Sequence, residues 1–202
     1  MRLYLTRHGQ TASNVGRLLD TAAPGADLTD LGRQQARDLV ERVATMLAGE
    51  DLGAVYASDL VRARQTATPL AQSLGLDVVV VDGLREIQAG DWEMTDDWMP
   101  FVEAVTRWGD DPTERIPGGE TGVEFMQRYE DALLRIAGDG HSAALAVSHG
   151  AAIRCWTTAT FGLGTDFFAT RNLDNTLVVT LEHEPSTGWG LVAWGDEPVV
   201  DA

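Results

Sequence analysis

The sequence contains no lysine, so all 15 of its basic side chains are arginine. This absence excludes Schiff-base chemistry on a lysine and a Walker-type phosphate-binding loop, which requires one. Only one cysteine is present, so no disulfide can form within the chain, and this is typical of a reducing compartment. The helical pattern around Cys155 predicts a buried structural thiol rather than a reactive one.

Long hydrophobic runs are also missing. No segment approaches the ~18 apolar residues of a membrane span, and the apolar stretch before Arg7 is much shorter than the core of a signal peptide. Positive charge is scarce, because 31 acidic side chains give a formal net charge of −16 and the isoelectric point is about 4.4. Such a surface repels polyanions. We therefore expect a cytoplasmic protein without a nucleic-acid or membrane partner.

The length of 202 residues and a hydrophobic content of 44% suit one domain over residues 1–202. Short apolar runs alternate with helical patterns, which predicts an α/β fold around a mostly parallel sheet with one antiparallel edge. The expected strands are 2–6, 54–58, 77–81, 143–147, 175–181 and 189–194, and the expected helices are 30–48, 59–74, 122–137 and 150–161.

The alternation breaks at residues 90–118, which contain Trp92, Trp98 and Trp108, several acidic residues and three prolines. In an α/β domain, such an excursion often forms a cap or lid over the carboxyl ends of the strands. A surface insertion without a role at the site is an equally good interpretation of the pattern.

Two segments share one pattern of possible chemical interest. In residues 3–14 (LYLTRHGQTASN) and 143–150 (AALAVSHG), an apolar run leads into a histidine followed by glycine. Ligands of open α/β sheets bind outside the carboxyl ends of the strands, so His8 and His149 would face one crevice if their strands are neighbours. Arg7 beside His8, and Arg62 in the first turn of the next helix pattern, would make this crevice an anion pocket suited to phosphate.

A histidine nitrogen beside an arginine-bound phosphoryl group can attack phosphorus and form a phosphohistidine. The flanking arginines favour the neutral form of His8, and we expect Gly9 to let the backbone approach the phosphate. The leaving group needs a proton donor. Candidates are Glu86, Asp91 and Glu93, and composition alone does not choose among them.

Six blocks of the sequence, taken together, resemble the histidine phosphatase superfamily, also called the phosphoglycerate mutase-like family, on its phosphatase side. They occur in the family's order: LTRHGQTASN, LTDLGRQQA, YASDLVRARQTA, LREIQAGDWE, PGGET and VSHGAAIR. The resemblance implies a three-layer α/β/α sandwich and a metal-independent enzyme without a cofactor. It also implies that His8 is the phosphorylated nucleophile, that Glu86 is the proton donor, and that Arg7, Arg62, His149 and Asn14 bind the phosphate.

The chain departs from the mutases of this family after Asn14, where it lacks their Phe-Thr-Gly-Trp-like stretch, and in the acidic character of residues 90–118. A mutase must bind a second acidic group, which calls for additional basic residues. We therefore expect a histidine acid-type phosphatase that acts on a small phosphorylated metabolite, as a monomer or homodimer. The alternatives are a cofactor-dependent phosphoglycerate mutase and a catalytically silent phosphate-binding or regulatory protein on the same fold.

Overall fold

A computed structural model of the protein describes residues 1–47, 49–164, 167 and 171–199. Within these residues, seven strands form one sheet in the order β3-β2-β4-β1-β5-β6-β7. The strands are β1 (Arg2–Arg7), β2 (Ala54–Ala57), β3 (Val78–Val80), β4 (Ala143–Ser148), β5 (Val178–Glu184), β6 (Gly188–Trp194) and β7 (Glu197–Pro198). Neighbouring pairs among β3, β2, β4 and β1 are parallel, whereas β5, β6 and β7 extend the sheet as one antiparallel edge.

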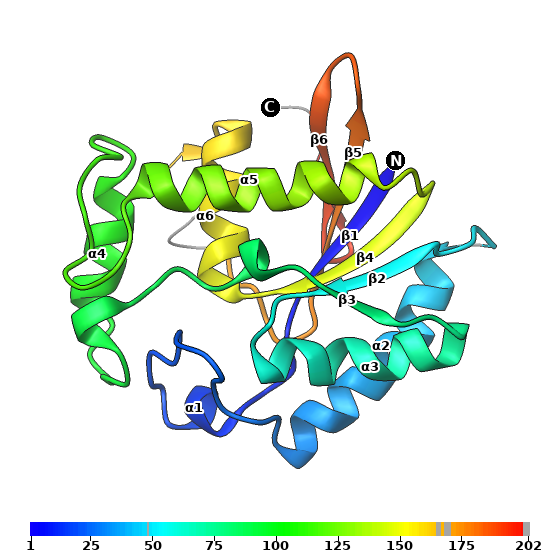
Figure 1. The fold of residues 1–202 in the computed structure, drawn as a ribbon, viewed down its shortest axis with the longest axis horizontal. Coiled ribbons are helices and arrows are strands. Elements are labelled where there is room, and N and C mark those ends of the chain that lie inside the picture. The colour runs from blue at the N-terminus through cyan, green and yellow to red at the C-terminus, as the bar shows by residue number, and fades with distance from the viewer. Residues whose placement is uncertain (48, 165–166, 168–170, 200–202) are drawn as a thin grey trace.

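Helices cover both faces of the sheet (Figure 1). On one face lie α2 (Asp30–Leu47) and α3 (Val61–Leu74), and on the other lie α5 (Gly122–Gly138) and α6 (Gly150–Phe161). Alternate strand residues supply the two cores, as β1 illustrates: Leu3 and Leu5 pack on the α5 side and Tyr4 packs on the α2 side. The expected three-layer α/β/α sandwich is therefore confirmed.

Local sequence signals explain where several elements begin and end. At the start of α5, the Thr121 hydroxyl accepts the backbone N–H of Glu124, and the Glu124 carboxylate accepts the N–H of Thr121. At the end of α6, Gly162 adopts the left-handed conformation that glycine tolerates best. Cys155 lies buried in α6, and burial raises the pKa of its thiol to about 12, so its predicted structural character is confirmed.

Residues 90–118 form the short 3₁₀ turn η2 (Gly90–Trp92), helix α4 (Met99–Arg107) and connecting loops. Figure 1 shows α4 beyond the end of α5, at one side of the sandwich. The helix buries Phe101, Ala104 and Val105 in the core on the α5 side of the sheet. A second unpredicted helix, α1 (Ala12–Val15), follows the first histidine motif.

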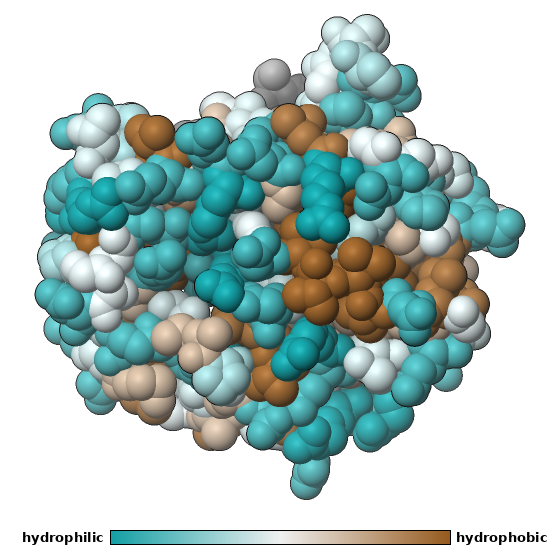
Figure 2. All heavy atoms as spheres, viewed as in Figure 1, coloured by the Kyte–Doolittle hydropathy of each residue, from teal (hydrophilic) through white to brown (hydrophobic). Residues whose placement is uncertain are grey.

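Figure 2 shows apolar side chains gathered beside the edge strand β3, where Val79 and Val80 are exposed. No helix in the part of the chain that the structure describes is long and apolar enough to cross a membrane.

Candidate active site

The strand register brings the two histidine motifs together. Strands β1 and β4 are parallel neighbours, and Arg7 pairs with Ser148, so His8 and His149 leave the sheet at the same level. Their ring centroids are 5.2 Å apart. The expectation that both histidines face one crevice depended on their strands being neighbours, and the register meets that condition.

Arg62 completes this cluster from the first turn of α3. Its Nε donates a hydrogen bond to Nε2 of His8 at 3.0 Å. An arginine nitrogen cannot accept, so Nε2 must carry the lone pair and the proton of neutral His8 must be on Nδ1. This assignment agrees with the second contact of the ring, because Nδ1 lies 2.7 Å from the carbonyl oxygen of Gly9 and can donate to it.

The electrostatic environment keeps the His8 ring neutral. Burial lowers the pKa of His8 well below its ordinary value, and the positive charges of Arg62 and Arg7 lower it further. The same cause acts on His149, where burial dominates and Arg62 contributes next. A neutral ring with its lone pair on Nε2 is the form of histidine that can act as a nucleophile.

His149 lies deeper than expected. It is fully buried and does not line the pocket described below. Its Nε2 lies 2.6 Å from the hydroxyl of Ser58, and that hydroxyl also accepts the N–H of Leu60 at 3.4 Å. The hydroxyl can donate to Nε2 or accept from it, and in the tautomer in which Ser58 donates, the ring proton of His149 is on Nδ1.

Three buried nitrogen atoms around His8 have no hydrogen-bond partner among the described residues: Nε of Arg7, NH1 of Arg62 and Nδ1 of His149. The rest of each arginine is held by backbone, because Arg7 NH1 donates to the Leu173 carbonyl at 2.7 Å and Arg62 NH2 donates to the Asp20 carbonyl at 2.7 Å. Buried donors are rarely left unpaired in folded proteins. These three fit an anionic ligand that accepts several hydrogen bonds.

The absence of a side chain at Gly9 permits a close contact between its backbone and helix α2. A Cβ atom at this position would lie 2.6 Å from the carbonyl oxygen of Gly32, in the first turn of α2. A Cβ atom on Gly32 would in turn lie 2.1 Å from the carbonyl oxygen of Gln10. The two glycines thus allow the backbone after His8 to pass directly against α2, while the expected approach of the Gly9 backbone to a phosphate stays a prediction.

A pocket of about 190 Å³ opens next to His8. Five of the six predicted site residues line it: Arg7, His8, Asn14, Arg62 and Glu86. Asn14 is held by its Oδ1 atom, which accepts the N–H of Thr11 at 3.1 Å and a side-chain N–H of Asn175 at 3.3 Å. Its own amide nitrogen is a donor suited to a ligand in the pocket.

The structure also distinguishes the three candidate acids, because Glu86 lines the pocket and Asp91 and Glu93 do not. The carboxylate of Glu93 accepts hydrogen bonds from the backbone of Thr21 and Ala22 and from the Thr21 hydroxyl, at 2.6 to 2.9 Å. Asp91 lies against Gly118, where a Cβ atom would come within 2.3 Å of its carboxylate. Neither carboxylate therefore reaches the pocket, and that of Glu93 joins the 90–118 segment to the loop after α1.

Glu86 lies at the N-terminus of α6. Its carboxylate accepts the backbone N–H groups of Ala152 at 2.7 Å, Ala151 at 3.0 Å and Ile87 at 2.9 Å. The first turn of a helix has unpaired N–H groups and partial positive charge, so it orients a carboxylate well. These three hydrogen bonds hold the Glu86 carboxylate at the wall of the pocket beside His8.

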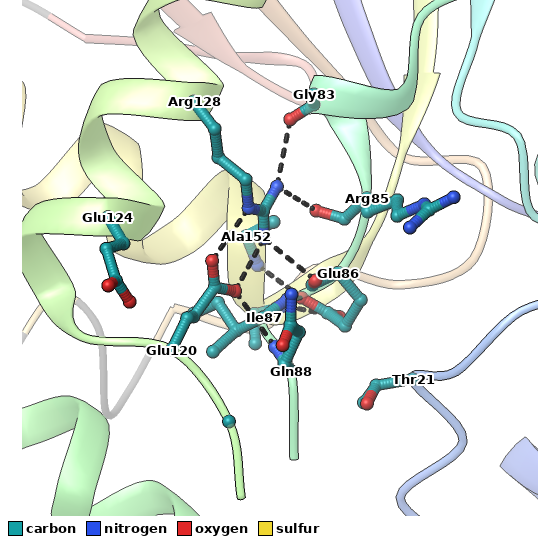
Figure 3. A network of polar contacts seen from close by, with 12 residues as sticks. Thr21, Gly83, Arg85, Glu86, Ile87, Gln88, Glu120, Glu124, Arg128 and Ala152 are labelled. Carbon is teal, nitrogen blue, oxygen red and sulfur yellow. Dashed lines mark hydrogen bonds and ion pairs between the residues drawn. The ribbon is translucent and has the colours of Figure 1, made fainter. Parts of the chain in front are cut away.

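The loop that carries Glu86 is clamped by Arg128 of α5, as Figure 3 shows. The Arg128 guanidinium donates to the carbonyl oxygens of Gly83, Arg85 and Glu86 at 2.9 to 3.0 Å. It also pairs with the buried carboxylate of Glu120 at 2.7 Å, which itself accepts the N–H of Gln88. Three hydrogen bonds of the planar guanidinium go to the backbone of this short segment and the ion pair with Glu120 orients the guanidinium, which together position Glu86.

Residue patterns did not identify several groups at the site. Asp20 lines the pocket with its Oδ1 atom 3.6 Å from Arg62 NH1, while its Oδ2 atom accepts the Ser13 hydroxyl and the Ala26 N–H. Asn175 donates to the carbonyl oxygen of His8 at 2.9 Å, although we left it outside the predicted site. The only signal for Asp20 was its place in the unusual stretch after Asn14.

Two further residues line the pocket, namely Arg154 of α6, which no sequence pattern singled out, and Trp98 of the 90–118 segment. Arg154 interacts electrostatically with Glu86, and burial lowers the pKa of its guanidinium. No group of three or more histidine, cysteine or acidic residues within the described part of the chain could hold a metal ion.

Comparison with known proteins places this geometry in a family. The profile of the histidine phosphatase superfamily (branch 1) matches residues 3–197. A probable phosphoglycerate mutase GpmB from Erwinia tasmaniensis is 34% identical, with 97% of this chain and 93% of the relative covered. The PE-PGRS family protein PE_PGRS11 of Mycobacterium tuberculosis is 32% identical over 96% of this chain, but the match spans only 36% of that longer protein.

Solved structures of similar fold include phosphatases. A mycobacterial glucosyl-3-phosphoglycerate phosphatase in complex with VO3 superposes with a TM-score of 0.77 at 29% identity, over 96% of this chain and 98% of that one. The alpha-ribazole phosphatase from Shigella flexneri has a TM-score of 0.75 at 28% identity, with both chains covered completely.

The buried neutral histidines make a prediction about pH. Below the ordinary histidine pKa of about 6.5, the unfolded chain binds protons that native His8 and His149 do not. The free energy of unfolding therefore falls as the pH decreases from 6.5, by up to about 1.4 kcal/mol per pH unit for each of the two histidines. Urea denaturation between pH 5.5 and 7.5 measures this slope. The His149→Gln variant should have a shallower slope, and equal slopes in the variant and the wild type would contradict the assignment.

The Arg128 clamp makes a prediction about stability. Arg128→Ala leaves the buried Glu120 carboxylate without its cation and three carbonyl groups without donors, so we expect a loss of about 3 kcal/mol. The control is Arg115→Ala, which removes an exposed ion pair with Glu124 and should cost less than about 1 kcal/mol. Chemical denaturation of both variants tests the difference, and similar losses would show that the clamp adds little.

Proposed function

Because the chain belongs to the histidine phosphatase superfamily, branch 1, we propose that it hydrolyses phosphomonoesters of small metabolites through a phosphohistidine intermediate on His8. One observation carries this proposal: the neutral, buried ring of His8 presents its lone pair on Nε2 to Arg62, in a cluster of unpaired nitrogen donors. This is a nucleophile placed inside an anion-binding site.

The phosphoryl group of the substrate takes the place of the direct contact between Arg62 and His8. Its oxygen atoms accept hydrogen bonds from NH1 of Arg62 and from Nε of Arg7, two buried donors without a hydrogen-bond partner among the described residues. His149 does not line the pocket, so its Nδ1 reaches the phosphate only when the phosphoryl group enters the space between Arg62 and His8. The amide of Asn14 donates from the opposite lining of the pocket. Positioned N–H donors of this kind also stabilise the charge on the equatorial oxygens during phosphoryl transfer.

In the first step, the lone pair of His8 Nε2 attacks phosphorus, so a P–N bond forms while the P–O bond to the leaving group breaks. Glu86 enters this step protonated, having taken a proton from the monoanionic form of the phosphoester as it binds, and gives that proton to the departing oxygen, which leaves as an alcohol. The ring, now bonded to phosphorus and still protonated on Nδ1, becomes positively charged. The Gly9 carbonyl, 2.7 Å from Nδ1, stabilises that charge.

In the second step, water attacks phosphorus and gives a proton to the Glu86 carboxylate. The P–N bond breaks, its electron pair returns to Nε2, and inorganic phosphate leaves. His8 and Glu86 are then in their starting forms. Glu86 thus acts first as acid and then as base, a double role that requires the fixed orientation supported by the α6 N-terminus and Arg128.

Hydrolysis is favoured over a mutase reaction by the contacts of the two arginines in the 90–118 segment. Arg107 pairs with Glu114 at 2.8 Å and Arg115 pairs with Glu124 at 2.5 Å, and neither lines the pocket. These cations are therefore not directed at a second acidic group of a substrate. The phosphatases among the similar solved structures support the same conclusion.

Replacing the nucleophile tests the reaction. His8→Ala should abolish phosphate release from nitrophenyl phosphate, and the wild type should form an acid-labile, base-stable phosphate on His8 when quenched during turnover. Neither protein should interconvert 3- and 2-phosphoglycerate. The His183→Ala control should retain activity. Interconversion would favour the mutase, and absence of both phosphate release and labelling would favour a silent phosphate-binding protein.

Replacing the acid tests the role of Glu86. In Glu86→Gln, the rate with an alkyl phosphate should fall at least ~100-fold, whereas the rate with nitrophenyl phosphate should fall much less, because nitrophenolate hardly needs a proton. Glu93→Gln is the matched control, since the Glu93 carboxylate does not itself line the pocket and its loss should affect both substrates equally. Equal losses in Glu86→Gln would exclude proton donation by this residue.

A further inference from the structure

The phosphate pocket continues into a second cavity. This neighbouring groove has a volume of about 660 Å³ and shares Arg7, Asn14 and Trp98 with the pocket beside His8. Its remaining lining comes from two loops, with Gly16 and Arg17 after α1 and Asp96, Asp97 and Met99 at the start of the α4 region. A substrate whose phosphoryl group lies beside His8 would extend its leaving group into this groove.

Trp98 is held in a defined position at the boundary of the two cavities. Its indole N–H donates to the carbonyl oxygen of Arg17 at 2.6 Å. Two backbone hydrogen bonds join the same loops, from Leu19 N to Thr95 O at 2.9 Å and from Met94 N to Leu19 O at 2.7 Å. Since its N–H group is already paired, the surface that Trp98 can offer to a ligand is the apolar ring.

Other residues on the wall near Trp98 are also apolar. Leu18, Leu19 and Phe101 line the pocket together with Trp98, and Phe101 is almost completely buried. This side therefore differs from the side with Arg7, Arg62 and His8. The apolar wall is suited to the carbon skeleton of a leaving group rather than to a second phosphate or carboxylate.

Charges along the groove balance each other. Its lining contains two arginines, Arg7 and Arg17, and two aspartates, Asp96 and Asp97. A balanced set gives no net field that would favour either an additional anion or an ammonium group. Carboxylates and guanidinium groups are, however, good bidentate partners for adjacent hydroxyl groups, the first as acceptors and the second as donors.

We propose that this groove is a leaving-group subsite for a neutral, hydroxylated ring, so that the preferred substrates are sugar monophosphates whose ring packs on Trp98. The proposal rests on the proposed function, because it assumes that the phosphoryl group lies beside His8. To the proposed function it adds a substrate class, the sugar monophosphates, and a residue that determines specificity, Trp98.

Binding to a variant that cannot turn over separates this proposal from catalysis. In the His8→Ala background, calorimetric titration should give at least tenfold tighter binding of glucose 6-phosphate than of glycerol 3-phosphate, which lacks a ring. Adding Trp98→Ala should weaken glucose 6-phosphate binding about tenfold and change glycerol 3-phosphate binding less than about twofold. Trp98→Phe keeps an aromatic ring and should fall between. Trp92→Ala, in the same segment but outside both cavities, is the control.

Steady-state kinetics of the protein that retains His8 provide the second test. The kcat/KM for glucose 6-phosphate should exceed that for 3-phosphoglycerate and for phosphocholine, and Trp98→Ala should lower only the first. Tighter binding of 3-phosphoglycerate or phosphocholine, or an equal effect of Trp98→Ala on all ligands, would overturn the subsite. Sugar-selective binding without hydrolysis would refute the proposed function and leave the subsite supported.

Discussion

The hydrogen bond from Arg62 to His8 is the contact on which the site depends. Both side chains are only 3% exposed, so a permanent cation is placed against an imidazole where water cannot shield either group. The ring must then remain neutral, with its lone pair directed at Arg62. A buried charge is costly unless it is paired, and much of the surrounding structure meets that requirement.

Asp20 and the backbone around it compensate part of the free-energy cost of burying the charge of Arg62. The loop after α1 turns back so that the Asp20 carbonyl and carboxylate both lie close to Arg62. Gly25 fits only because it has no side chain, since a Cβ atom there would lie 2.3 Å from Arg62 NH1. On the other side of the pocket, the negative charge of Glu86 faces Arg7 and Arg62. A chain with a net charge of −16 thus keeps Arg7 and Arg62 close together by placing backbone and carboxylate oxygen atoms around them.

The site has a rigid part and a loop-built part. His8, His149, Arg62 and Glu86 are held by strand ends, helix starts and the Arg128 clamp, which are the most strongly constrained elements of the sandwich. The groove beside Trp98 is built from two loops joined by a few hydrogen bonds. Loops accept changes of sequence more readily than a packed sheet. The same phosphate chemistry can therefore be combined with different leaving groups in proteins of this fold.

The sequence by itself determined the layered α/β fold, most of the expected helices and strands, and the selection of Arg7, His8 and Arg62 as residues of one pocket. These features depend on local periodicity and on motifs at strand ends, which a linear pattern contains. Only the tertiary structure decided which of Glu86, Asp91 and Glu93 reaches the pocket, because the three lie within eight residues and differ only in how their loop folds. It also decided that His149 lies behind the pocket wall, that Gly9 makes room for α2, and that Asp20 and Trp98 belong to the site. The physical reason is that these positions are set by distances between segments far apart in the chain, and such distances follow from strand register and packing rather than from neighbouring residues.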